Sequence, residues 1–140
     1  GGTSAAGLAL GGKLLGAPYR VHPISVGADR PTLLAQELDL SNRVCEVLGL
    51  PPAMTEDDFC VHDEYVGAEY GDAPPSTLEA IRLAARVEGV FLDPVYTGKA
   101  FSGLIGEIRK GNVRKDETVV FVHTGGLPII FAYDDVLAKL

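Results

Sequence analysis

The fold class follows most directly from residues 118–126, which read TVVFVHTGG. The first six residues form a continuous run of β-branched and aromatic side chains with almost no polar alternation. Such a run is typical of a strand buried on both faces, as in the middle of a parallel sheet. We therefore predict a central strand over 118–123, with Thr124 at its carboxyl end and Gly125-Gly126 turning into a helix.

The remainder of the chain alternates predicted helices with short predicted strands. Helical periodicity with flanking caps and glycines predicts helices over residues 3–15, 31–48, 76–88, 98–110 and 127–140. Short apolar runs predict strands over residues 20–26, 60–66 and 90–92. We expect Thr3 to be the N-cap of the first helix, and Ser76 with Glu79 to form a capping box. This alternation predicts an α/β fold with a mostly parallel sheet flanked by helices.

Three helices carry patterns that predict how they pack. An apolar stripe in the second is expected to face the core, and it consists of Leu33, Leu34, Leu38, Val44, Val47 and Leu48. In the fourth, the corresponding stripe is Phe101, Leu104, Ile105 and Ile108. The first helix contains Gly7, Gly11 and Gly12, which lower helix propensity by up to about 1 kcal/mol each. We expect these glycines to allow close packing against a neighbour.

Composition and charge restrict the class of protein. The 140 residues are 46% apolar and 22% charged, as in a globular domain, and the net charge is −7. Such an acidic chain is not expected to bind nucleic acid, because phosphate binding needs clustered Lys and Arg. No apolar run approaches the roughly 18 residues of a membrane span, and no signal peptide is expected. The two cysteines make no disulfide framework, so we predict reduced thiols in a cytoplasmic protein. Neither the cysteines nor the three histidines show the spacing of metal ligands, so we predict no metal site.

Three loops offer groups for binding a ligand at the carboxyl ends of the predicted strands. Gly1-Gly2-Thr3 precedes a helix, where backbone N–H groups and a hydroxyl suit a phosphate. Residues 92–99 offer a phenol and a hydroxyl, and Thr124 offers a hydroxyl at a strand tip. Each loop also has a purely structural interpretation, as a turn that needs glycine or proline.

These loops resemble motifs of one enzyme family. The pattern Gly1-Gly2-Thr3-x-Ala5-x-Gly7-Leu8 is similar to the phosphate loop of fold-type-II pyridoxal-phosphate (PLP) enzymes. Residues 88–100, EGVFLDPVYTGKA, and 122–128, VHTGGLP, resemble blocks of D-cysteine desulfhydrases and 1-aminocyclopropane-1-carboxylate deaminases. The resemblance covers nearly the whole chain and implies part of a tryptophan-synthase-β-like PLP fold.

The resemblance also implies roles for individual residues. Gly1, Gly2 and Thr3 would bind the PLP phosphate. Thr97 and Thr124 would lie on the cofactor's ring side, with Thr124 at the pyridine nitrogen. Catalytic roles near the substrate's Cα and leaving group fall to Tyr70 and Tyr96. The expected partner is a small amino-acid substrate, and the full-length protein is expected to be a homodimer.

Two positions favour one branch of the family. Deaminases typically place Glu directly after the equivalent of Tyr96, and Leu before the closing Gly-Gly. Here those residues are Thr97 and Thr124, which favours a D-cysteine desulfhydrase that releases pyruvate, sulfide and ammonia. The alternatives are the deaminase and a non-catalytic binding module with the same fold.

The chain opens inside a glycine loop, without an initiator methionine, and we expect it to be a fragment. Residues 1–140 would be the C-terminal part of a PLP enzyme whose N-terminal part carries the Schiff-base lysine. None of the lysines present here resembles that lysine in context, so the fragment alone is expected to be inactive. Lys99, just inside a helix start, is predicted to have a surface or structural role.

Overall fold

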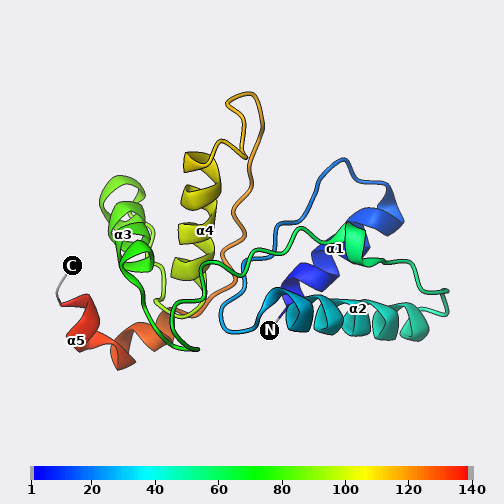
Figure 1. Cartoon of the computed structure of the whole chain (residues 1–140), viewed down its shortest axis with the longest axis horizontal. Helices are drawn as coiled ribbons and strands as arrows, with labels where there is room; N and C mark the ends of the chain where they lie inside the picture. Colours follow the sequence, from blue (N-terminus) through cyan, green and yellow to red (C-terminus); the bar gives the residue numbers. More distant parts are fainter. Residues whose placement is uncertain (1, 139–140) are drawn as a thin grey trace. The chain divides into compact units, whose positions relative to one another are not determined.

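The computed structural model describes residues 2–138, and the chain divides into two compact units, Gly1–Asp63 and Glu64–Leu140 (Figure 1). The first unit contains α1 (Thr3–Leu15), α2 (Arg30–Val47) and a short 3-10 turn, η1 (Glu56–Asp58). The second contains α3 (Pro75–Leu83), the π-helical turn η2 (Ala84–Glu88), α4 (Thr97–Arg109), the 3-10 segment η3 (Leu127–Ala132) and α5 (Asp134–Leu137). Within residues 2–138, no helix combines the length and the apolar character that a membrane crossing requires.

The first helix, α1, has the predicted bounds but a different cap. Gly2 is the N-cap, with φ of 75° and no side-chain hydrogen bond, and Thr3 is already helical. A φ in this left-handed region favours glycine, so the predicted cap at Thr3 is wrong. Gly16, also left-handed, ends the helix.

The second helix, α2, buries only the N-terminal part of the predicted stripe, where Leu33 is buried and Leu34 and Leu38 pack against the core. Asp29 caps it by accepting a 3.0 Å hydrogen bond from the N–H of Thr32. The residues that α2 buries are spaced four apart, and they are Leu33, Glu37, Ser41 and Cys45. Of the predicted stripe, Val44, Val47 and Leu48 are 44%, 87% and 58% exposed. The neighbour of α2 is α1, which buries Ala6, Ala9, Leu10 and Gly12, and this tertiary contact rather than the periodicity of α2 decides how far the stripe is covered.

In the second unit, α3 and α4 pack against one another. Their buried apolar cluster is Ile81, Ala84 and Leu92, with Leu78, Phe101, Phe121 and Leu137 packed against it. The predicted capping box does not form, because the Glu79 carboxylate binds both terminal nitrogens of Arg109 at 2.6 and 3.1 Å. Instead α3 begins at Pro75, where a missing N–H costs nothing.

On α4 the predicted stripe is again only partly buried. Its most deeply buried residues are small or polar, namely Thr97, Gly98, Lys99, Ser102, Gly103 and Glu107. Ile108 of the predicted stripe is 50% exposed. Periodicity identified the helix but not the face that packs inward.

The predicted parallel sheet is not formed by the described residues. Residues 118–123 run as an extended segment without a ladder partner (Figure 1, orange), and Val119, Val120 and Val122 are 46%, 79% and 48% exposed. Phe121 alone packs inward, against Phe101 with ring centroids 5.1 Å apart. The prediction of a buried strand was wrong for this chain because a strand needs neighbouring strands, and residues 2–138 supply none here.

What remains of strand pairing lies in the first unit. Ile24 and His62 form a parallel bridge, in which Ser25 N donates to the His62 carbonyl at 2.7 Å and His62 N donates to the Pro23 carbonyl at 2.9 Å. The predicted strands 20–26 and 60–66 are reduced to this contact. Residues 90–92 form no strand either.

The last predicted helix, 127–140, is divided. Its first part is the 3-10 segment η3 and its second part is the short α5, separated at Tyr133, whose φ of −124° is not helical. The Tyr133 hydroxyl donates to the Gly71 carbonyl at 2.8 Å. This tertiary contact holds Tyr133 at the break. Residues 139 and 140 lie outside the described residues.

Candidate functional site

The loop before α4 is organised by one buried carboxylate, that of Asp93. Its Oδ2 accepts hydrogen bonds from the N–H groups of Val95 and Tyr96 at 2.9 and 2.7 Å. Its Oδ1 accepts from the N–H and the hydroxyl of Thr97 at 2.8 and 2.6 Å. Of these donors only Thr97 belongs to α4 (Thr97–Arg109), whose N-cap is Tyr96 without a side-chain cap. Asp93 therefore organises the loop that leads into α4 and fixes the residues predicted to be functional.

The two predicted catalytic tyrosines lie together. The hydroxyls of Tyr70 and Tyr96 are 2.5 Å apart, and the rings meet edge to face with centroids 6.3 Å apart. The hydrogen bond with Tyr70, followed by burial, raises the pKa of Tyr96. A phenol with a raised pKa keeps its proton at neutral pH and can donate it. Tyr70 is 60% exposed, so the pair is open to a ligand.

The closing motif at 124–126 folds back onto the Asp93 loop. A Cβ built on Gly126, whose φ is 92°, would lie 2.5 Å from Asp93 Oδ1. His123 shapes the same turn, because its Nδ1 accepts from the N–H of Gly125 at 3.2 Å, which leaves Nε2 to donate to the Phe91 carbonyl at 3.0 Å. The motif therefore contacts the loop that carries Tyr96 and Thr97, although about 30 residues separate them in sequence.

The two predicted ring-side hydroxyls differ in their surroundings. Thr97 is buried, and its hydroxyl donates to Asp93 Oδ1 and accepts from the Asp93 N–H at 3.0 Å. Thr124 is exposed, and no other described residue bonds to its hydroxyl. The Thr124 hydroxyl is thus free to bind a ligand, whereas the Thr97 hydroxyl is already hydrogen-bonded to Asp93 at the start of α4. Their roles at a cofactor ring stay predictions.

The predicted phosphate loop belongs to the first unit, whereas the residues above belong to the second. Gly2 is the N-cap of α1, and the N–H groups of Thr3, Ser4 and Ala5 have neither an intrahelical acceptor nor a side-chain cap. A Cβ on Gly2 would lie 3.0 Å from Glu37 Cγ and 3.2 Å from Leu33 Cδ1, so only glycine fits. The third predicted phosphate residue, Gly1, lies outside the described residues.

Comparison with known proteins identifies the family. The family described as "Pyridoxal-phosphate dependent enzyme" matches residues 1–125. The chain belongs to the pyridoxal-phosphate dependent enzymes. The 1-aminocyclopropane-1-carboxylate deaminase of Burkholderia multivorans is 36% identical over 137 residues, which are 98% of this chain and 40% of the relative. That of Methylobacterium nodulans is 36% identical over 132 residues, which are 94% of this chain and 39% of the relative.

A solved structure agrees with this assignment. This chain superposes on the crystal structure of a homologue of 1-aminocyclopropane-1-carboxylate (ACC) deaminase with a TM-score of 0.86 and 35% sequence identity. The match covers 99% of this chain and 41% of the homologue. The predicted resemblance and the predicted cofactor, PLP, are thereby confirmed. The chain spans about two fifths of the length of the relatives it matches.

The described residues fit the phosphate of PLP. The first turn of α1 offers uncapped N–H donors and begins with the hydroxyl-bearing Thr3, and the left-handed Gly2 adds no side chain at this helix end. In the second unit, Thr124 and the two phenols supply neutral hydrogen-bonding groups of the kind that orient a ring and a substrate. A PLP enzyme needs both kinds of group.

Of the two roles predicted for Lys99, surface or structural, its position contradicts only the first. Its side chain is fully buried, and burial lowers its pKa, while the nearby Asp72 opposes that shift. A surface role is therefore wrong for Lys99. Nothing in the sequence signalled this burial, because a lysine in the first turn of a helix is usually solvated.

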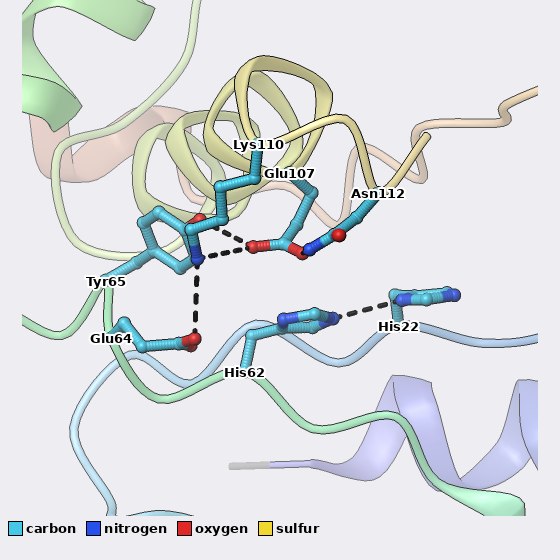
Figure 2. A network of polar contacts seen from close by, with 7 residues as sticks. All are labelled: His22, His62, Glu64, Tyr65, Glu107, Lys110 and Asn112. Atoms are coloured by element: carbon cyan, nitrogen blue, oxygen red, sulfur yellow. Dashed lines mark hydrogen bonds and ion pairs between the residues drawn. The ribbon is translucent and has the colours of Figure 1, made fainter. Parts of the chain in front are cut away.

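Sequence reasoning also missed a polar network at the C-terminal end of α4 (Figure 2). The Glu107 carboxylate accepts hydrogen bonds from Tyr65 Oη at 2.8 Å, Lys110 Nζ at 2.8 Å and Asn112 Nδ2 at 2.7 Å. Lys110 also lies 5.2 Å from the centroid of the Tyr65 ring and 3.5 Å from a Glu64 oxygen. The network ties the start of the second unit to α4, and the spacing of Glu107, Lys110 and Asn112 was its only sequence signal.

Figure 2 also draws a histidine pair of the first unit. His22 Nδ1 and His62 Nε2 are 3.0 Å apart, and the rings stack with centroids 5.3 Å apart. His62 thus belongs both to this pair and to the bridge with Ile24. Its two members are 40 residues apart, so no local pattern could indicate it.

Proposed function

We propose that the full-length protein containing this chain is a PLP-dependent lyase of the D-cysteine desulfhydrase type. It would convert D-cysteine and water to pyruvate, hydrogen sulfide and ammonia. The observation that carries the choice is the pair of neutral hydroxyls, Thr97 and Thr124, on the two loops that meet at Asp93. A neutral hydroxyl at the pyridine nitrogen would hold its proton less firmly than a carboxylate would.

The chain's own residues would divide the work. Gly2 and Thr3, with Gly1, would hold the cofactor's phosphate at the start of α1, and Thr124 would orient its ring. The chemistry that bound PLP supplies is an electron sink for the charge that develops at the substrate's Cα. A weaker sink suits the loss of a good leaving group such as sulfide.

The two tyrosines, Tyr70 and Tyr96, would supply and orient the proton that the leaving group needs. Tyr96 Oη is protonated at neutral pH, as a phenol normally is, and the Tyr70 hydrogen bond raises its pKa further. We propose that Tyr96 delivers this proton to the sulfur as the carbon–sulfur bond breaks. Tyr70 would orient Tyr96 and, being exposed, would contact the substrate. The hydrogen bond from the Tyr96 N–H to the Asp93 carboxylate would keep Tyr96 in place during the proton transfer.

The principal alternative is 1-aminocyclopropane-1-carboxylate deaminase, the activity after which the two relatives above are named. At 36% identity those names fit the chain at least as well as the desulfhydrase does. A non-catalytic binding module is the third candidate, and it would bind PLP without turnover of either substrate.

One comparison of substrates tests the proposal. The purified full-length protein is given PLP and either D-cysteine or 1-aminocyclopropane-1-carboxylate, and sulfide and ammonia are measured. We expect sulfide from D-cysteine and little ammonia from the cyclopropane substrate. The double variant Thr97→Glu, Thr124→Leu should shift activity toward the second substrate.

Three outcomes would oppose the proposal in different ways. Ammonia from the cyclopropane substrate alone would make the wild-type protein a deaminase. PLP binding without any turnover would make it a binding module. Unchanged D-cysteine turnover in the double variant would show that these two threonines do not set the specificity.

A further inference from the structure

The N-terminus of α1 has the free donors of an anion site. The N–H groups of Thr3, Ser4 and Ala5 are uncapped, and α1 is 13 residues long. Such a helix end carries a partial positive charge that favours an anion. By itself this shows only that an anion is tolerated there.

A second, independent feature is Glu37 of α2, whose side chain is directed at this end of α1. Glu37 is 0% exposed, and the nearest atoms to a Cβ built on Gly2 include Glu37 Cγ at 3.0 Å and Oε1 at 3.5 Å. Neither of its carboxyl oxygens has a hydrogen-bond partner among the described residues. A buried carboxylate without a partner is costly, whereas a neutral carboxylic acid beside an anion has an acceptor for its proton.

The charges around Glu37 favour its neutral form. Burial raises the pKa of Glu37 to about 7. Lys13, the charged residue of α1, pairs with Asp58 at 2.5 Å, and on α2 Arg43 lies 3.9 Å from Asp39. These charged groups are therefore engaged with one another rather than with Glu37.

We propose that Glu37 is a positioning residue of the anion site at the start of α1, and that it carries a proton whenever a phosphate monoester is bound there. The identity of that monoester, the phosphate of PLP, rests on the proposed function. An ionised Glu37 would place a negative charge beside the ligand and compete for the same helix end. Binding of the anion therefore raises the pKa of Glu37 further, and affinity falls as the pH rises through about 7.

The test compares the full-length protein with its Glu37→Gln variant, which keeps the size and a donor but cannot ionise. The dissociation constant of PLP is measured by equilibrium dialysis between pH 6 and 8.5, and that of inorganic phosphate by phosphorus NMR. Ionisation of the ligand is common to both proteins, so it cancels in the ratio of their constants. We expect wild type to bind about as well as the variant at pH 6 and about thirtyfold more weakly at pH 8.5, where few molecules have a protonated Glu37.

A matched control is Ser41→Ala, which removes another unpartnered buried polar group from the same face of α2. Its ratio to wild type should stay constant with pH, because serine does not titrate. A role of Glu37 in packing alone would give the same constant ratio for Glu37→Gln. That result would overturn the proposal.

Two further outcomes remain decisive. If PLP binds at no pH, the proposed function fails, and the inorganic phosphate ratio alone then decides the role of Glu37. If Glu37→Gln does not fold, the infrared band of a protonated carboxylic acid is followed in the wild-type protein at pH 7.5. Growth of that band when phosphate is added supports the proposal, and an unchanged band contradicts it.

Discussion

Asp93 accepts four hydrogen bonds with two oxygens, all from residues 95–97. This one carboxylate therefore fixes the backbone of Tyr96 and the hydroxyl of Thr97, at the point where α4 begins. Gly98 and Gly126 both lie so close to Asp93 that a Cβ on either would be 2.5 Å from one of its oxygens. Local helix formation and the placing of the candidate site thus depend on one residue.

The first prediction concerns Tyr96. In the full-length protein, Tyr96→Phe should lower kcat for the preferred substrate by about 100-fold or more, because it removes a proton donor near the reacting atoms. The Tyr70 hydrogen bond raises the pKa of Tyr96 above the ordinary value of 10. Protonated Tyr96 is the active form, so its loss should reduce wild-type activity only above about pH 10. The measurement is a pH profile of kcat.

Tyr65→Phe is the matched control, since it removes a phenol that is hydrogen-bonded to Glu107 in the same unit but outside the site. It should leave kcat within about twofold of wild type. Equal losses in the two variants would mean that Tyr96 acts through stability rather than chemistry.

At the scale of helices, close approach depends on small residues. On α1 the buried residues include Ala6, Ala9 and Gly12, and a Cβ on Gly12 would lie 2.8 Å from the Tyr19 ring. By contrast, a Cβ on Gly7 or Gly11 would meet nothing within 4 Å. The expectation that all three glycines permit close packing therefore holds for Gly12 alone.

The second prediction uses this contrast within one helix. Gly7→Ala should raise the free energy of unfolding by about 1 kcal/mol, because alanine is the better helix former and the position is open. Gly12→Ala should gain nothing or destabilise, since Tyr19 would have to move and lose its 3.0 Å hydrogen bond to the Leu8 carbonyl. Urea unfolding of the two variants checks this. An equal increase in the free energy of unfolding of both variants would show that the Tyr19 side chain can move away from residue 12 without a loss of stability.

At the scale of the whole molecule, the chain exposes apolar segments that have no partner among residues 2–138. Val120 is 79% exposed in the extended segment, Val47 is 87% exposed on α2, and Phe131 is 86% exposed in η3. The relatives are about two and a half times as long as the region that matches. We propose that the remainder of the full-length protein supplies the neighbouring strands and covers these residues.

The third prediction follows from this proposal. In hydrogen exchange, the amides of residues 118–123 should be strongly protected in the full-length protein and almost unprotected in residues 1–140 alone. The reason is that ladder hydrogen bonds form only when neighbouring strands are present. Amides of 101–109 in α4 serve as the internal control and should be protected in both, because their acceptors lie within the helix. Equal protection of 118–123 in the two proteins would contradict the proposal.

The sequence by itself determined the elements with local causes and the family. The bounds of α1, α2 and α4 depend on periodicity and on terminal glycines, and both are local properties. The motifs around Tyr96 and Thr124 carried the resemblance, and the structure brings their loops together at Asp93.

Only the tertiary structure decided which faces are buried and which polar groups lie inside. The burial of Glu37 and Lys99 depends on neighbours that are distant in sequence, so no window of the sequence could indicate it. The same cause explains the error at 118–123. An apolar run shows that a segment can be buried on both faces, but strand pairing is a property of two segments, and the described chain contains only one of them.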